Sequence, residues 1–306
     1  MSAPARQALS RYALLAIGIV GLSTAGVFYK LATAPVLAIV AYRMLFAVAI
    51  VLPMSSVWRL FGNRAGRPKI SRADTIASSA AGALFALDVT LWALSLQFTS
   101  VSSAALLVSM DPVFVAIIAA LVFGERPSLA MVAGMAVAVA GATIITVGDF
   151  RIAGRAVWGD ALALSAALAE TGYLLLGRHV RRRVDTLPYV SIVYTSCAAC
   201  VWIAVLAFRA PMQIGGHDIW IALALAVCAT VIGHTLVSKS LGHMPAAVVA
   251  ISFLSQPIIT ALLAYLVLHQ VVAPLTALGG SIALAGIGVV VFANERSVAE
   301  VPSQTV

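Results

Sequence analysis

Residues 94–148 read LSLQFTSVSSAALLVSMDPVFVAIIAALVFGERPSLAMVAGMAVAVAGATIITVG, and residues 239–293 align with this stretch without a gap. About 12 of the 55 positions are identical in this alignment. Chance matches between apolar residues inflate such a count, so the shared positions of proline and glycine carry the argument. These are Pro112 with Pro257, Gly134 with Gly279 and Gly141 with Gly286. A long repeat in an apolar chain predicts two related halves, an arrangement typical of membrane transporters.

The composition excludes a water-soluble domain. Of the 306 residues, 62% are hydrophobic and 10% are charged, with a mean hydropathy of +1.06, whereas soluble domains carry about 25% charged residues. One transmembrane helix needs about 20 apolar residues. The sequence therefore predicts an all-α integral membrane protein with ten transmembrane helices. The predicted spans are 12–32, 35–54, 74–95, 100–122, 128–147, 157–177, 187–208, 217–238, 245–268 and 272–293.

The ten spans divide into two five-helix repeats, 12–148 and 157–293, with short tails at 1–11 and 294–306. Because five is an odd number, the second repeat begins on the opposite side of the membrane, so the repeats are expected to be inverted around a central cavity. The first span ends in Lys30 and is long, which favours a retained helix over a cleaved signal peptide.

The net charge of +8 is not read as a sign of nucleic-acid binding, because the distribution of the basic residues indicates how the chain is oriented in the membrane. With the N-terminus inside, fourteen basic residues fall on the cytoplasmic face and four on the other face. Positive residues are enriched in cytoplasmic loops. Both tails are therefore predicted to be cytoplasmic, in the inner membrane of a bacterium. The basic loops 55–73 and 178–186 are expected to contact anionic lipid headgroups.

The motifs around the two prolines are specific enough together to suggest a family. They are Met110-Asp111-Pro112-Val113-Phe114 with Gly124-Glu125-Arg126-Pro127, Ser255-Gln256-Pro257, Gly134 and Gly141 with Gly279 and Gly286, Tyr29-Lys30, and Arg43. In this combination the chain resembles the EamA-type members of the drug/metabolite transporter superfamily over residues 12–293. The resemblance implies two EamA units and transport of a small molecule, without naming the substrate. The second repeat has His269-Gln270 where the first has Gly124-Glu125, so any role of the Glu125 carboxylate does not carry over to the second half.

Charged side chains are rare in the predicted spans, and each one needs a partner or a wet cavity, because a charge at the bilayer centre costs about 2.5–3.5 kcal/mol. The repeat offset places Asp88 of the third span opposite Gly233, next to His234 of the eighth span. Asp and His are common proton carriers within membranes. We expect Asp88 and His234 to line the cavity as a substrate or proton site; the alternative is a structural hydrogen bond.

Asp111 and Gln256 occupy equivalent places, each directly before a proline. Because proline removes a backbone donor and bends a helix, we expect kinks at Pro112 and Pro257, with polar groups gathered at the break. The two helices are expected to face each other across the cavity. Asp111 is then either a cavity residue or a partner of Arg43.

Four further residues are candidates with an open alternative. Glu170 could contact an amine-bearing cargo, with Tyr173 one turn away, or pair with Arg178 or Lys239. Arg43 could anchor a carboxylate or serve as a structural partner of Asp88 or Asp111. Trp92 lies one turn beyond Asp88 and could line the cavity or anchor the helix at the interface.

The function expected from these features is a secondary transporter of small organic metabolites such as amino acids. It would be an exporter that works by alternating access with proton coupling. The alternatives are an uncoupled exchanger or facilitator, an importer, and a polytopic membrane enzyme. The sequence has no phosphate loop, metal-ligand cluster or nucleophile with a base, so no cofactor, metal site, nucleic acid or ATPase subunit is expected. The protein would be a monomer or a homodimer.

Overall fold

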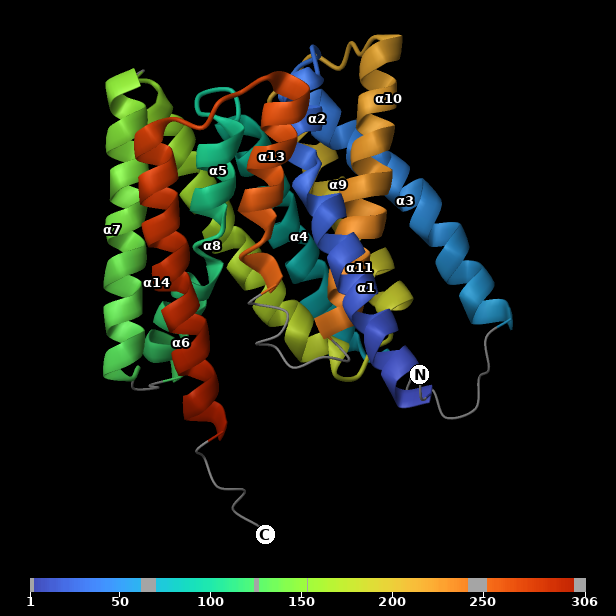
Figure 1. Cartoon of the computed structure of the whole chain (residues 1–306). Coiled ribbons are helices and arrows are strands. Elements are labelled where there is room, and N and C mark those ends of the chain that lie inside the picture. Colours follow the sequence, from blue (N-terminus) through green and yellow to red (C-terminus); the bar gives the residue numbers. More distant parts are fainter. Residues whose placement is uncertain (1–2, 62–69, 124–126, 153, 242–251, 300–306) are drawn as a thin grey trace.

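The computed structural model describes residues 3–61, 70–123, 127–152, 154–241 and 252–299, and this part of the chain is a bundle of helices (Figure 1). The helices of the first half are α1 (Ala3–Ser23), α2 (Ala25–Leu31), α3 (Val36–Phe61), α4 (Arg72–Ser95), α5 (Val101–Val108), α6 (Asp111–Phe123) and α7 (Leu129–Ile152). Those of the second half are α8 (Ala156–Arg181), α9 (Thr186–Ala207), α10 (Gly216–Ala224), the π-helix η1 (Leu225–His234), α11 (Thr235–Leu241), α13 (Gln256–Leu268) and α14 (Pro274–Ala299).

The predicted all-α membrane fold is confirmed. Among the described residues, eight segments are long and apolar enough to cross a membrane. The other two predicted spans correspond to α8, a 26-residue helix that carries Asp160 and Glu170, and to α13, which has 13 residues. Residues 245–251 of the predicted ninth span lie outside the described residues. The helices extend beyond the predicted tail boundaries, since α1 begins at Ala3 and α14 ends at Ala299.

The inversion of the repeats is visible where α7 meets α14. These helices are equivalent in the repeat, yet they run antiparallel, because Gly134 meets Gly286 at one end of the contact and Gly148 meets Leu275 at the other. A Cβ atom on Gly134 would lie 2.9 Å from the carbonyl oxygen of Gly286, and one on Gly279 would lie 2.7 Å from that of Gly141. The repeat offset exchanges these two contacts, as a pseudo-two-fold axis requires. Small residues let the backbones approach closely.

Each proline motif lies next to a break in its span. The fourth span is interrupted at Ser109 and Met110, between α5 and α6, and the ninth is interrupted at Leu254 and Ser255, directly before α13. Pro112 and Pro257 thus lie in the first turn of the following helix, where a missing backbone N–H costs nothing. The first span is also divided, at Thr24 between α1 and α2, which the sequence pattern did not indicate.

The two ends of the bundle differ in charge. The beginning of α1 and the end of α14 lie at the same end of the bundle (Figure 1). The start of α4, the turn after α8 and the end of α11 lie on this side, which we call the basic end, and they include Arg72, Arg182 and Lys239. The ends of α2 and α9, which include or precede Lys30 and Arg209, lie at the opposite end. The positive-inside rule predicts that the basic end faces the cytoplasm.

This orientation predicts a labelling pattern. In a variant without the three native cysteines, an exposed Arg182→Cys should be reached by a membrane-impermeant maleimide only after the cells are permeabilised. Arg209→Cys, exposed at the opposite end, should react in intact cells and is the matched control. Labelling of position 182 in intact cells would contradict the orientation.

Candidate functional site

A small cavity lies between helices of both repeats. Its volume is about 40 Å³, which holds a few water molecules. The side chains that line it are Leu22, Ala25, Arg43, Asp88, Val89, Trp92, Val108, Glu170, Ala229, His234 and Gln256. The structure therefore brings together six of the eight polar or aromatic residues that the sequence indicated.

Arg43 of α3 is held from two sides. Its side chain is 2% exposed. Its Nε donates to Oγ1 of Thr230 at 2.9 Å, and its Nη1 donates to the hydroxyl of Tyr29 at 3.0 Å. Among the described residues, Arg43 has no carboxylate within 4.0 Å, so neither of the alternative partners, Asp88 and Asp111, forms an ion pair with it. The guanidinium is oriented by neutral hydroxyl groups instead.

Asp88 of α4 and His234 of η1 both lie at the cavity. Their side chains are 5% and 9% exposed. The His234 ring stands edge-on to Phe85, with ring centroids 4.6 Å apart. Asp88 lies within electrostatic range of Arg43 and Glu170. One repeat therefore supplies an acid to the cavity and the other supplies an imidazole at a nearly equivalent place.

Asp111 and Glu170 form a second acidic element beside Asp88. Their side chains lie close enough to influence each other electrostatically, and Oδ1 of Asp111 is buried without a hydrogen-bond partner in the described part of the chain. The alternative partners of Glu170 are wrong, because the described part of the chain contains no ion pair between Glu170 and Arg178 or Lys239.

The remaining candidates divide between the cavity and its surroundings. Trp92 lines the cavity and packs edge-on against Tyr29 with centroids 5.9 Å apart, which favours a cavity role over an interface anchor. Gln256 also lines the cavity. Tyr173 is not among the lining residues; its hydroxyl lies 3.3 Å from Oγ of Ser238 and its ring packs on Phe85. The kink residues Pro112 and Pro257 are likewise outside the lining.

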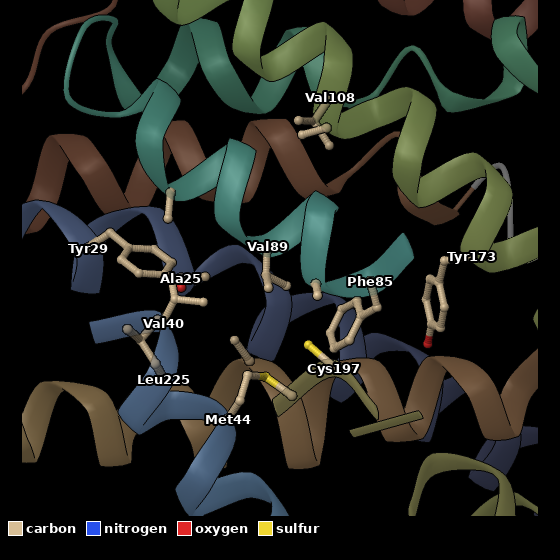
Figure 2. Close-up of a cluster of buried hydrophobic side chains, with 14 of the residues drawn as sticks. Ala25, Tyr29, Val40, Met44, Phe85, Val89, Val108, Tyr173, Cys197 and Leu225 are labelled. Atoms are coloured by element: carbon tan, nitrogen blue, oxygen red, sulfur yellow. The ribbon is translucent and has the colours of Figure 1, made fainter. Parts of the chain in front are cut away.

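Sequence reasoning missed the groups that hold the charged residues in place. Tyr29 and Thr230 orient Arg43, and Phe85 supports His234. Figure 2 shows Tyr29, Phe85 and Tyr173 as part of the buried apolar core, with Cys197 beside Phe85. A neutral aromatic or threonine in an apolar span gives no signal by itself, and only Tyr29 lay in a motif.

Equivalent polar contacts tie the helices together at the two ends of the bundle. At the basic end, Asp74 in the first turn of α4 lies 3.6 Å from Arg183, which follows α8. At the other end, Asp218 in the first turn of α10 accepts hydrogen bonds from the backbone N–H and the hydroxyl of Thr33, at 2.8 and 2.7 Å. The repeat offset superposes α4 on α10–α11, so each contact involves an aspartate in the first turn of equivalent spans.

Comparisons with known proteins agree with this architecture. The model of the EamA-like transporter family matches residues 9–147 and again residues 157–292. A solved structure, titled only as the crystal structure of a protein, is similar in fold with a TM-score of 0.64 and 18% sequence identity, over 92% of this chain and 96% of that chain. No curated protein matches the chain.

Proposed function

Since the chain belongs to the EamA-like transporter family, we propose that it is a secondary transporter that exports a small zwitterionic metabolite, such as an amino acid. The observation that carries the proposal is the buried cavity in which Arg43 lies near Asp88 and Glu170. A multi-pass membrane protein of this family moves molecules across the membrane, and the cavity residues indicate which chemistry they can recognise.

Arg43 is suited to bind a carboxylate. A guanidinium has five N–H donors, and contacts with Thr230 and Tyr29 use two of them. The remaining donors are free of protein partners among the described residues and can form a paired contact with a carboxylate. Asp88 and Glu170 offer acceptors for an ammonium group, and the Trp92 ring adds a surface that attracts cations. The cavity therefore complements both ends of a zwitterion.

The volume of the cavity supports alternating access. Ligand pockets usually measure about 300–1,000 Å³, so the 40 Å³ found here is too small to hold a cargo. A cargo can enter only if helices separate at one end. The matched contacts Asp74–Arg183 and Asp218–Thr33 provide one tie to break at each end, and inverted repeats supply two related open forms.

Proton coupling belongs to the same proposal. Asp88 and His234 line the cavity and can each exchange a proton with it. The protein would work in the bacterial cytoplasmic membrane with both termini inside, as a monomer or homodimer, and without a nucleotide-hydrolysing subunit. A facilitator or exchanger with the same cavity but no proton step is the second candidate. Transport that does not respond to a pH gradient would identify it.

The substrate class can be tested in cells. Media from cells that lack the protein and cells that overproduce it should differ in one or a few amino acids or related zwitterions, measured by untargeted mass spectrometry. A difference confined to compounds without both an amine and a carboxylate would contradict the proposed substrate class.

Arg43→Lys tests the carboxylate contact. Lysine keeps the charge but cannot hold the planar, multiple contacts of arginine, so the KM for the exported compound should rise about tenfold or more. Met44→Leu, a change at the neighbouring buried position outside the cavity lining, is the control. An unchanged KM in Arg43→Lys would show that Arg43 is structural.

A further inference from the structure

The eighth span contains a π-helix where its counterpart in the first repeat is a regular α-helix. The π-helix η1 covers Leu225–His234, and the repeat offset places it on residues 80–89 within α4. In η1 the hydroxyl of Thr230 reaches the carbonyl of Leu225, five residues earlier, at 3.5 Å. Such segments are rare, occur mostly as single turns and are frequent at functional sites.

The π-helix changes which side chain faces the cavity. By sequence alignment the counterpart of Asp88 is Gly233, but the residue that lines the cavity is His234. Gly233 instead faces α1, where a Cβ atom would lie 2.9 Å from Cδ2 of Leu22. Because each hydrogen-bonded ring of a π-helix contains one residue more than that of an α-helix, the segment shifts the register by about one residue. His234, and not the aligned Gly233, is therefore the residue that this segment presents to the cavity.

Tyr194 of α9 holds this segment from the side. Its hydroxyl donates to the carbonyl oxygen of Thr230 at 3.0 Å and lies 3.0 Å from Oγ1 of Thr235. The side chain of the same Thr230 accepts the hydrogen bond from Arg43. Tyr194 and Thr230 are both 0% exposed. Thr230 thus connects two residues: its backbone carbonyl binds Tyr194, and its side-chain hydroxyl binds Arg43.

We infer that Tyr194 is a positioning residue of the cavity. It stabilises the π-helical register of η1, so that Thr230 orients the Arg43 guanidinium and His234 faces the cavity opposite Asp88. The Thr230 carbonyl also accepts from the backbone N–H and the hydroxyl of Thr235 within the segment. Removal of the Tyr194 hydroxyl takes away the one donor that comes from another helix, which weakens the π-helical register and favours an α-helical one in which Thr230 and His234 rotate away. The inference rests on the proposed function only in assigning the positioned side chains to cargo binding.

The test compares Tyr194→Phe with Tyr189→Phe. Both are buried tyrosines of α9, but the Tyr189 hydroxyl has no hydrogen-bond partner in the described part of the chain, which makes Tyr189→Phe a matched control. Hydrogen–deuterium exchange in nanodiscs should be about three- to tenfold faster over residues 225–235 in Tyr194→Phe and unchanged in the control. The imidazole ¹⁵N signals of His234, assigned with His234→Gln, should shift only in Tyr194→Phe.

Equal exchange and unchanged His234 signals in the two variants would overturn the inference. Neither measurement requires a substrate, so the result is separate from that of the proposed function. If the exchange and the His234 signals change as expected while the wild-type protein exports no zwitterion, the positioning role stands and only the proposed substrate class fails.

Discussion

Asp88→Asn is expected to lower transport by at least about tenfold while the protein remains folded in the membrane. The amide keeps the size and part of the hydrogen bonding of the carboxylate, but it cannot pair with an ammonium group or exchange a proton. The loss of one hydrogen bond to a charged group corresponds to about tenfold or more in binding. Because Asp88 is 5% exposed and lines the cavity, its loss acts directly on the groups that face the cargo.

The measurement is the export rate at equal amounts of inserted protein, with the thermal midpoint in detergent as the folding check. Asp185→Asn is the control, since Asp185 is exposed in the connection between α8 and α9. Wild-type rates and wild-type pH dependence in both Asp88→Asn and His234→Gln would show that these residues are structural. Reduced rates with unchanged pH dependence would leave them as cargo ligands and refute proton coupling.

The second large effect is expected at the α7–α14 contact. A Cβ atom on Gly141 would lie 2.6 Å from the carbonyl oxygen of Gly279 and would also collide with the backbone nitrogen of Ala283. Two backbones must separate to admit it, so Gly141→Ala should lower the free energy of unfolding by about 3 kcal/mol. Thermal melting in detergent, followed by size-exclusion chromatography, reports the change.

Gly288→Ala provides the matched control for this contact. It lies in α14 as well, but its Cβ atom would meet only Cδ1 of Leu254, at 3.9 Å. The free energy of unfolding of Gly288→Ala should stay within about 0.5 kcal/mol of the wild-type value or rise slightly, because alanine favours helix more than glycine does. Equal melting of Gly141→Ala and Gly288→Ala would contradict the close antiparallel packing of the two repeats.

The fold follows from features that the sequence displays directly. Span length, charge asymmetry and the offset of 145 residues depend on composition and spacing, and inversion follows from an odd helix count. The residues expected at the cavity were found by their cost in lipid: Asp88 and Arg43 are conspicuous because a charge in hydrocarbon needs a reason. The repeat also predicted that Asp88 and His234 line the same cavity, because the offset aligns Asp88 with Gly233, next to His234.

The partners of these residues were not predictable in the same way. Arg43 binds Thr230, which is 187 residues away, and no local pattern distinguishes this threonine from others in apolar spans. The π-helix η1 has no composition that separates it from an α-helix; it is held by Tyr194 from another helix. Glu170 lies beside Asp111 and forms no ion pair with Arg178 or Lys239 in the described part of the chain, because the sequence does not show which side chains meet across helices.

The central claim, that this cavity binds a zwitterion for export, is tested most directly with purified protein in proteoliposomes loaded with a mixture of amino acids. Mass spectrometry of the external medium would follow efflux with and without an inward proton gradient, for the wild type and Asp88→Asn. The account predicts efflux of one or a few amino acids, accelerated by the gradient in the wild type and reduced at least about tenfold in Asp88→Asn. Equal efflux of every compound from wild-type, Asp88→Asn and protein-free liposomes would contradict it.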